Sequence, residues 1–285
     1  MKVLITGSGG QLGKEWVQFC EQNEIHFSDF SSSELDITNT SLLRQTILKH
    51  QPDVIINCAA YTKVDEAEEE KIKATQINAT SVHKMATLCN ELNIKLVHFS
   101  TDYVFSGNVE DQSKFPDGYP ENHERKPVNE YGYSKYLGEK ALEESGCDYL
   151  LIRVSWLCGK YGNNFVKTML RLGKKMDNLS VVDDQFGSPT FTDQVVKHTF
   201  QLITANESGI FHISSEGIIS WYEFALEIFK EAEINIELKK IDSSAYPTKA
   251  KRPSFSKLST QKISNIDGVS ILNWKDGLKR LLKQL

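Results

Sequence analysis

Short apolar runs alternate along the chain with longer stretches in which apolar residues recur every three or four positions. The runs, which we interpret as strands, occupy residues 2–6, 25–29, 53–57, 95–100, 149–154 and 210–213. The intervening stretches predict helices, among them residues 72–92, 163–176, 221–229 and 274–285. A continuous apolar run is typical of a strand buried on both faces. The alternation therefore predicts an α/β fold with a doubly wound parallel sheet.

A glycine-rich turn follows the first apolar run without a spacer. Gly7, Gly10 and Gly13 are three residues apart, and a helical stretch containing Trp16 and Cys20 comes next. Glycine has no Cβ, so it allows positive φ and close approach of a phosphate, and the start of a helix offers unpaired amides to an anion. The spacing differs from the usual G-x-G-x-x-G of dinucleotide sites, so a plain tight turn is the alternative interpretation.

Further candidate residues lie in the segments that follow other predicted strands. Asp36 follows the second run, Ala60 and Tyr61 follow the third, and Thr101 follows the fourth. Ligands of doubly wound sheets bind at the carboxyl ends of the strands. We therefore expect these residues to share one edge of the sheet with the glycine turn. The acidic stretch at 65–70 is expected to be mainly a solvated face.

Two Tyr-x-x-x-Lys pairs lie in the predicted helix after residue 130, namely Tyr131 with Lys135 and Tyr136 with Lys140. Residues four apart share a helix face, and an ammonium there should lower the pKa of the phenol, making it an acid for a carbonyl oxygen. The two pairs differ by roughly 140° around the helix, so only one can face a given site. We assign the catalytic role to Tyr131 and Lys135, which are nearer the strand ends, with Thr101 as an assisting hydroxyl.

Composition and charge exclude several classes of protein. The 285 residues carry a net charge of −5, and no basic cluster predicts a nucleic-acid surface. No apolar run approaches the ~20 residues of a membrane span, and the N-terminus does not resemble a signal peptide. The five cysteines, mostly in apolar stretches, suit reduced thiols in the cytoplasm. The seven histidines show no paired spacing, so no catalytic metal is expected.

Several motifs in the same order resemble a known family. Residues 1–13, 100–105 and 131–135 are similar to the extended short-chain dehydrogenase/reductases, whose nucleotide-binding sheet is Rossmann-like. A finer resemblance, to the dTDP-4-dehydrorhamnose reductases, is carried by residues 35–38, 60–65, 153–156, 163–165, 184–190, 220–221 and 251–253. Together these motifs span nearly the whole chain.

The resemblance implies roles for individual residues. The catalytic group would be Thr101, Tyr131 and Lys135. The cofactor contacts would be Gly7, Gly10, Gln11, Leu12, Asp36, Ile37, Ala59, Ala60, Tyr61, Tyr131 and Lys135. The substrate contacts would be Thr101, Tyr103, Trp156, Asn163, Gln185 and Arg252. Two positions are notable: Ser106 stands where the family usually has aspartate, and Glu15 resembles a residue that binds Mg²⁺ between subunits in some members. The other ligands of that ion cannot be placed here, so we predict no metal.

The resemblance also implies an architecture and a reaction. Residues 1–154 with about 188–214 would form the dinucleotide-binding domain, and about 155–187 with 215–285 a smaller C-terminal substrate-binding lobe. The expected reaction is NAD(P)H-dependent reduction of the C4 keto group of dTDP-4-dehydro-β-L-rhamnose to dTDP-L-rhamnose, a step in cell-surface polysaccharide synthesis. The alternatives are a reductase or epimerase of another nucleotide sugar, or a non-catalytic NADP-binding regulatory subunit. A homodimer is possible.

The cofactor preference is expected to be weak. Discrimination in favour of NADPH usually needs an arginine or lysine near the end of the second strand, and residues 28–36 contain neither. Ser31, Ser32 and Ser33 could hydrogen-bond either a phosphate or a hydroxyl. We therefore expect both NADPH and NADH to be usable.

Overall fold

A single parallel sheet of six strands forms the centre of the computed structural model, which describes all 285 residues. The strands are β1 (Lys2–Thr6), β2 (His26–Phe30), β3 (Val54–Asn57), β4 (Lys95–Thr101), β5 (Tyr149–Val154) and β10 (Gly209–His212). Their order is β10-β5-β4-β3-β1-β2, so the winding reverses direction at β1. This confirms the doubly wound parallel sheet. The reversal point is where such sheets bind ligands.

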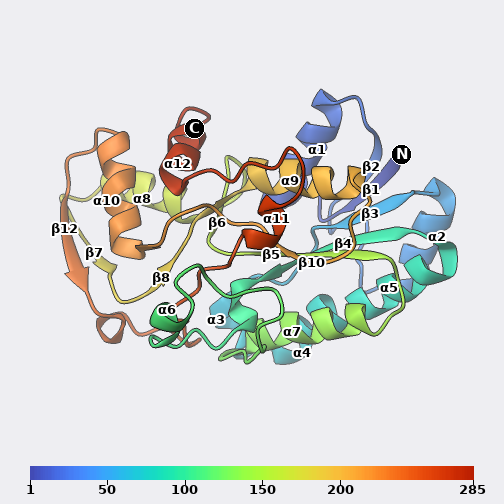
Figure 1. Ribbon diagram of the computed structural model, residues 1–285, viewed down its shortest axis with the longest axis horizontal. Coiled ribbons are helices and arrows are strands. Elements are labelled where there is room, and N and C mark those ends of the chain that lie inside the picture. The colour runs from blue at the N-terminus through green and yellow to red at the C-terminus, as the bar shows by residue number, and fades with distance from the viewer.

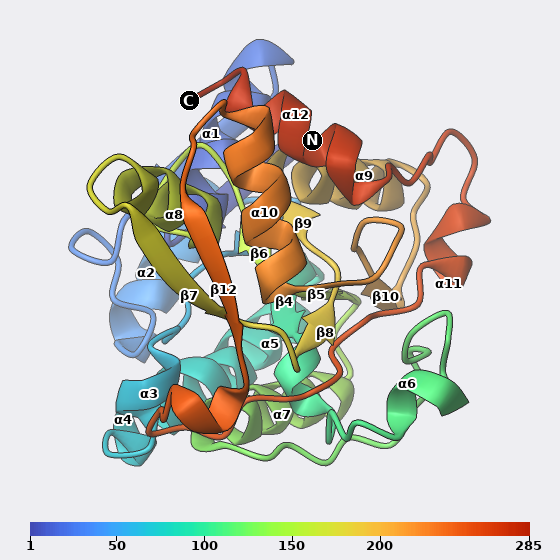
Figure 2. The same ribbon diagram turned by 90° about the vertical axis from the view of Figure 1, so that its left-hand side faces the viewer.

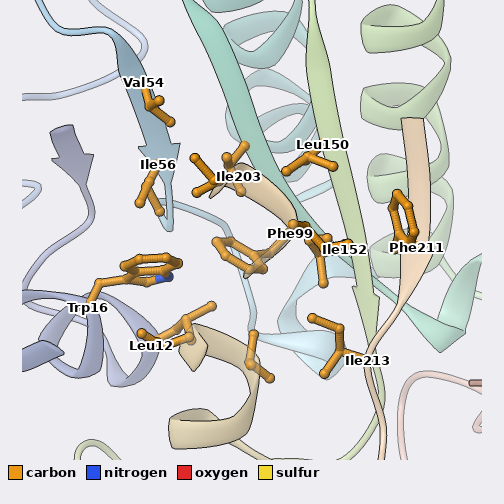
Figure 3. Packing of buried hydrophobic residues seen from close by; sticks show 14 of the residues in the cluster. Leu12, Trp16, Val54, Ile56, Phe99, Leu150, Ile152, Ile203, Phe211 and Ile213 are labelled. Atoms are coloured by element: carbon orange, nitrogen blue, oxygen red, sulfur yellow. The ribbon is translucent and has the colours of Figure 1, made fainter. Parts of the chain in front are cut away.

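Helices cover both faces of the sheet (Figure 1). On one face lie α1 (Gln11–Gln22) and α9 (Thr192–Thr204), and on the other α2 (Thr40–His50), α5 (Ser81–Leu92) and α7 (Glu130–Glu143). The first face buries Trp16 and Leu12 of α1 and Ile203 of α9 against strand residues such as Ile56 and Ile152 (Figure 3). Because both faces are covered, β1, β3 and β5 are mainly apolar, whereas the edge strand β2 is partly exposed and contains polar residues.

Local signals set the helix limits. Asn39 accepts a hydrogen bond from the amide of Leu42 through Oδ1 at 3.0 Å and so begins α2. Gln51 ends this helix in the left-handed conformation, with φ 46°. The helix expected at residues 163–176 is α8 (Phe165–Gly173), which begins later because Asn164 caps it.

The stretch expected to be one helix over residues 72–92 is interrupted. It contains α4 (Lys71–Thr75), a π-helical turn η1 (Gln76–Thr80) and then α5, preceded by the short α3 (Val64–Ala67). The π turn lies where α7 packs closely. A Cβ on Gly138 of α7 would collide with the carbonyl oxygen of Asn78 in η1. This close approach brings the side chain of Asn78 into the interior.

A second group of elements adjoins the carboxyl ends of the central strands (Figure 2). It contains α8, α10 (Trp221–Glu231), α12 (Trp274–Leu282) and the parallel pair β7 (Asn178–Val182) with β12 (Glu237–Ile241). Its own apolar cluster includes Val166, Phe224 and Trp274. The sequence did not indicate β7 or β12, because these exposed strands are rich in polar residues.

The remaining elements are short. They are β6 (Leu157–Cys158) with β9 (Thr190–Phe191), β8 (Phe186–Gly187) with β11 (Ile219–Ser220), η2 (Asp102–Val104), α6 (Asp111–Lys114), η3 (Ser243–Ala245) and α11 (Gln261–Ser264). Ile263 of α11 packs into the core of the main sheet. None of the helices has the length and apolar character that crossing a membrane requires.

Candidate active site

The glycine turn is built so that side chains are excluded from it. Gly7 has φ 69°, and a Cβ there would lie 2.6 Å from the amide nitrogen of Ala59. A Cβ on Gly13 would collide with the carbonyl oxygen of Gly7. The amide of Gly10 closes the turn by donating to that same oxygen at 3.0 Å. The backbone is therefore open to a ligand only because these residues are glycines.

The N-terminus of α1 is free to bind an anion beside this turn. No side chain caps it, and its first turn contains no acidic residue. A cavity of about 350 Å³ opens there. It is lined by Gly7, Gly9, Gly10, Ser32, Leu35, Asp36, Ile37, Cys58, Ala59, Ala60 and Ile77. Six of the expected cofactor residues thus meet in one cavity next to a positive helix end, as a dinucleotide requires.

Three other expected cofactor residues direct their side chains elsewhere. Gln11 donates through Nε2 to the carbonyl of Leu157 at 3.1 Å, and its Oε1 accepts from Asn164 at 2.7 Å. Leu12 is buried in the core. The hydroxyl of Tyr61 donates to Glu70 at 2.8 Å. None of these three residues lines the cavity.

The serine triplet after β2 is partly occupied by the protein itself. Ser31 donates to Oε2 of Glu34 from its amide at 2.8 Å and from its hydroxyl at 2.7 Å. These bonds hold the pKa of the Glu34 carboxyl below its usual value. A carboxylate therefore stands where the sequence suggested hydroxyls free to meet either a phosphate or a ribose.

The candidate catalytic hydroxyls lie together at the end of β4. Thr101 is the last residue of that strand, and Tyr131 lies in the first turn of α7, which Asn129 caps by accepting from the amide of Gly132 at 2.7 Å. The rings of Tyr103 and Tyr131 pack edge to face with centroids 5.7 Å apart. Gly132 allows this approach, because a Cβ there would collide with the carbonyl oxygen of Tyr103.

We expected Lys135 to lower the pKa of the Tyr131 phenol, and this expectation is wrong for the protein without a cofactor. Burial raises the pKa of Tyr131 to about 12, with a further rise from the Asp102 carboxylate and an opposing effect of the Thr101 hydroxyl. Lys135 is 2% exposed and directs Nζ to the carbonyl oxygen of Phe99 at 2.6 Å instead of the phenol. Burial also lowers the pKa of Lys135 to about 8. Desolvation thus outweighs the pairing that spacing along the helix suggested.

Asp102 is a residue of this site that sequence reasoning missed. Its Oδ1 accepts from the hydroxyl of Thr101 at 2.9 Å, and its Oδ2 is buried without a partner. Burial raises the pKa of this carboxyl to about 7. The only signal in the sequence was its position directly after Thr101.

Asn78 was missed as well. It is fully buried and accepts from the amide of Tyr61 at 2.8 Å through Oδ1. Its Nδ2 donates to the carbonyl of Tyr61 and to the hydroxyl of Ser134, each at 2.9 Å. Asn78 therefore ties the loop after β3 to α7. No spacing in the sequence pointed to it.

The second Tyr–Lys pair points away from this site. The ring of Tyr136 packs under the guanidinium of Arg125, 5.2 Å from its centroid. Lys140 is exposed and lies 3.7 Å from Glu144. The geometry thus separates the two pairs as the helical rotation predicted.

The expected substrate residues border the second group of elements. Trp156 has φ 48° and stacks on Trp221, with ring centroids 3.5 Å apart, and its Nε1 donates to Ser256 at 3.0 Å. Asn163 is exposed just before α8, and Gln185 is half-buried between β7 and β8.

Arg252 is held by a carboxylate from the acidic stretch. Its guanidinium contacts Asp65 through two bonds, at 2.7 and 3.2 Å. Asp65 also accepts from the amide of Ala250 at 3.1 Å. The Arg252 side chain therefore links its own segment to α3, and Asp65 is a structural partner more than a solvated charge.

Comparison with known proteins assigns the family. The model of the RmlD substrate binding domain matches residues 1–285. The chain belongs to this family. A dTDP-4-dehydrorhamnose reductase of Shigella flexneri is 37% identical over 100% of this chain and 98% of its own length. One from Aggregatibacter actinomycetemcomitans is 40% identical over 98% of each.

Solved structures agree with this assignment. The dTDP-4-dehydrorhamnose reductase of Bacillus anthracis, crystallised with NADP, has a TM-score of 0.94 and 40% identity over 100% of this chain and 99% of its own. The UDP-glucose 4-epimerase of Thermus thermophilus, with a TM-score of 0.82 but 15% identity, shares the fold.

The structure shows what surrounds Ser106 and Glu15, the two positions that the sequence singled out. Ser106 donates to Oδ2 of Asp111 at 3.2 Å, and the same oxygen accepts from Tyr119 at 2.7 Å, so Asp111 supplies a carboxylate in this loop. Glu15 accepts from Thr192 at 2.8 Å and pairs with Lys160 at 3.5 Å. No three His, Cys, Asp or Glu side chains gather closely enough to hold a metal ion.

Proposed function

We propose that this protein reduces the C4 keto group of dTDP-4-dehydro-β-L-rhamnose to dTDP-L-rhamnose with NADPH or NADH. The observation that carries the proposal is the placement of Thr101 and Tyr131 at the end of β4, on the edge of the sheet that holds the glycine turn. Relatives of at least 36% identity over the full chain bear the name of this reductase, and one was crystallised with NADP.

The residues present fit a dinucleotide. A Cβ at Gly7 or Gly13 would collide with the neighbouring backbone, so only glycine allows this tight turn, and the helix start beside it is uncapped. The first turn of α1 would hold the pyrophosphate, and Asp36 with Ile37 would border the adenosine half of the cavity. A bound nicotinamide cofactor supplies the hydride that adds to C4.

The protein's own part in the reaction is to orient the ketone and move a proton. Tyr131 gives its phenolic proton to the C4 oxygen as that oxygen gains negative charge. The hydroxyl of Thr101 gives its single proton to Oδ1 of Asp102 and accepts from the amide of Tyr103 in the free protein, so it would turn that proton from Asp102 to the C4 oxygen when the substrate binds. Lys135 would contact the cofactor.

We further propose that residues about 155–187 and 215–285 form the lobe that binds the nucleotide sugar. The stacked Trp156 and Trp221, with Asn163 and Gln185 nearby in the chain, support this assignment. Arg252 would contribute to substrate binding only while its guanidinium also remains hydrogen-bonded to Asp65. The free cysteines suit a cytoplasmic enzyme.

The test is an assay in which purified protein receives dTDP-4-dehydro-β-L-rhamnose, generated by coupled enzymes, and NADPH oxidation is followed. We expect turnover with this substrate and none with the UDP- or GDP-linked 4-ketosugars. Turnover of only the UDP or GDP compound would leave a reductase with another substrate. Cofactor binding without any turnover would favour the regulatory subunit.

A further inference from the structure

A chain of buried polar side chains crosses the sheet behind the site. Thr6 donates to Oδ1 of Asn57 at 2.7 Å, and the amide of Ala59 donates to the same oxygen at 3.2 Å. Nδ2 of Asn57 lies 3.1 Å from Nδ1 of His98, and Nε2 of His98 lies 3.2 Å from Nζ of Lys135. These four side chains are at most 2% exposed, so no solvent satisfies them.

The direction of hydrogen bonding along this chain is determined at Asn57. The amide of Ala59 can only donate, so it must meet the carboxamide oxygen, and the NH₂ group of Asn57 must face His98. An NH₂ group also only donates, so Nδ1 of His98 accepts. The ring proton of neutral His98 is then on Nε2, directed at Nζ of Lys135.

An Nε2–H group cannot form a hydrogen bond with an ammonium, because both groups can only donate. A charged lysine has three donors and no acceptor, whereas the neutral amine has a lone pair that can accept from His98. Nζ also donates to the carbonyl of Phe99 at 2.6 Å, which the neutral amine does equally well. The arrangement therefore favours the uncharged form of Lys135.

The carboxylate whose charge acts on Lys135 is already engaged by other side chains. Glu139, one turn later on α7, favours the ammonium, but both its oxygens accept from Arg153 at 2.8 and 2.9 Å, and Arg125 adds a third bond at 3.1 Å. Tyr131 lies one turn earlier on the helix, and Asp102 acts on Tyr131 from the end of β4.

The pKa values of Lys135 and His98 are both lowered, which agrees with the hydrogen-bond argument. Burial lowers the pKa of Lys135 to about 8, and burial with the charge of Lys135 lowers that of His98 well below its usual range. The lowered pKa keeps His98 neutral at alkaline pH, as the hydrogen-bond argument requires.

We propose that His98 is a positioning residue that favours the neutral amine of Lys135 in the cofactor-free protein, so that dinucleotide binding at alkaline pH is accompanied by uptake of one proton at Lys135. The inference rests on the proposed nicotinamide site. A dinucleotide brings hydroxyl acceptors and negative phosphates, which favour the ammonium, and the proton comes from solvent. At pH 9, above the pKa of the free protein, Lys135 is thus mainly uncharged until the cofactor is present.

His212 provides an internal contrast. It is also fully buried, and its Nε2 lies 3.2 Å from Nη1 of Arg153. A guanidinium stays charged and can only donate, so Nε2 of His212 must accept, and its proton must be on Nδ1. The two buried histidines are therefore expected to be opposite tautomers.

Nitrogen NMR of protein labelled in the histidine rings tests the first half of the proposal without cofactor. At pH 9 we expect the Nε2–H tautomer for His98 and the Nδ1–H tautomer for His212, assigned with His98→Gln and His212→Gln. An Nδ1–H tautomer at His98 would overturn the proposal, whatever the protein's substrate proves to be.

Calorimetric titration with NADPH at pH 9, in two buffers of different ionisation enthalpy, tests the second half. With a pKa near 8, Lys135 should be about nine-tenths uncharged, so uptake should approach one proton per NADPH. Asn57→Asp should reverse the His98 tautomer, because a carboxylate accepts from Nδ1–H, and should reduce the uptake at least by half.

His198→Gln is the matched control, since His198 pairs with Gln201 on α9 and does not touch the polar chain. It should keep the wild-type uptake. Zero uptake in the wild type, or equal uptake in the wild type and Asn57→Asp, would overturn the inference. Failure of NADPH to bind at all would refute the proposed function, and the tautomer measurement would still decide the role of His98.

Discussion

Tyr131 is placed to give a proton to the substrate, and Tyr131→Phe separates this role from packing against Tyr103. The ring is retained while the transferable proton is lost. We expect kcat to fall on the order of 10²–10⁴-fold, with the Kd for NADPH little changed. Steady-state reduction and a cofactor titration measure both.

Two further variants serve as comparisons for Tyr131→Phe. Lys135→Met should lower kcat and also weaken NADPH binding, because the amine lies on the cofactor side. Tyr136→Phe should stay within a few-fold for both, because that ring packs under Arg125. A near-normal kcat in Tyr131→Phe together with a large loss in Tyr136→Phe would mean that the other pair is catalytic.

Glu34 is expected to weaken the preference for NADPH. Its carboxylate uses the amide and hydroxyl of Ser31, donors that a 2′-phosphate could otherwise meet. Glu34→Gln should raise kcat/KM for NADPH relative to NADH roughly 3–10-fold, the modest effect of an exposed charge. Glu24→Gln, an exposed residue before β2, is the control. An unchanged ratio in Glu34→Gln would show that a different group sets the preference.

At the scale of residues, the sequence predicted the features that depend on position along the chain. Thr101 and Tyr131 could be placed together because one ends a strand and the other begins the next long helix. The direction of Lys135 and the burial of Asp102 and His98 could not be predicted. They depend on which backbone oxygen or side chain a neighbouring element presents.

The packing of α7 on the π turn η1 gives a prediction at the scale of elements. A Cβ in Gly138→Ala would meet the carbonyl oxygen of Asn78, so α7 must shift or the π turn must relax. We expect a net loss of about 1–3 kcal/mol in the free energy of unfolding, the usual cost of overpacking. Because α7 carries the candidate catalytic residues, kcat should fall too.

Urea unfolding and steady-state kinetics measure the two effects of Gly138→Ala. Lys140→Ala is the control on the same helix, since Lys140 is exposed. It should remain within about 0.5 kcal/mol of the wild type. Full stability and activity in Gly138→Ala would show that this contact does not hold the helix in place.

The helices and strands divide into those with a periodic pattern and those without one. The central strands were predictable because both of their faces are buried and their sequences are mainly apolar. The strands β7 and β12 were not, because they form a small, exposed pair. The π turn was not predictable either, since it arises from the close approach of another helix and not from its own residues.

For the whole molecule, the buried Asp102 predicts how stability depends on pH. Its carboxyl has a pKa of about 7 in the folded protein and about 4 when unfolded. Between these values the folded state binds the extra proton, so the free energy of unfolding falls as pH rises, by up to about 1.4 kcal/mol per unit. Asp102→Asn should remove this slope, which denaturation at pH 4 to 7 measures.

The buried Lys135 changes the free energy of unfolding in the opposite direction, and it does so at higher pH. Its folded pKa of about 8 is below the unfolded value, so the unfolded state binds the extra proton above pH 8 and stability rises from there toward pH 10. Lys135→Met should lack this rise. A stability curve of the same shape in the wild type and both variants would contradict the burial of these charges.

The overall architecture was predictable to the level of the sheet and its covering helices, because alternation of buried strands and amphipathic helices allows few other folds. How the second half of the chain is divided was harder to foresee. Residues 209–212 pair with β5, and the apolar run at 210–213 had predicted a strand there, whereas no pattern predicted that Ile263, from the stretch expected in the substrate-binding lobe, packs into the core of the main sheet.

The position of β10 has a consequence during synthesis on the ribosome. In the folded protein β5 pairs with β4 on one edge and with β10 on the other, so its second edge can be covered only after residue 212 has emerged. Until then the nascent chain displays an unpaired strand containing Leu150, Leu151 and Ile152, which invites association with other chains. A chaperone that binds nascent apolar strands should therefore engage this protein most strongly at intermediate lengths and release it once β10 docks.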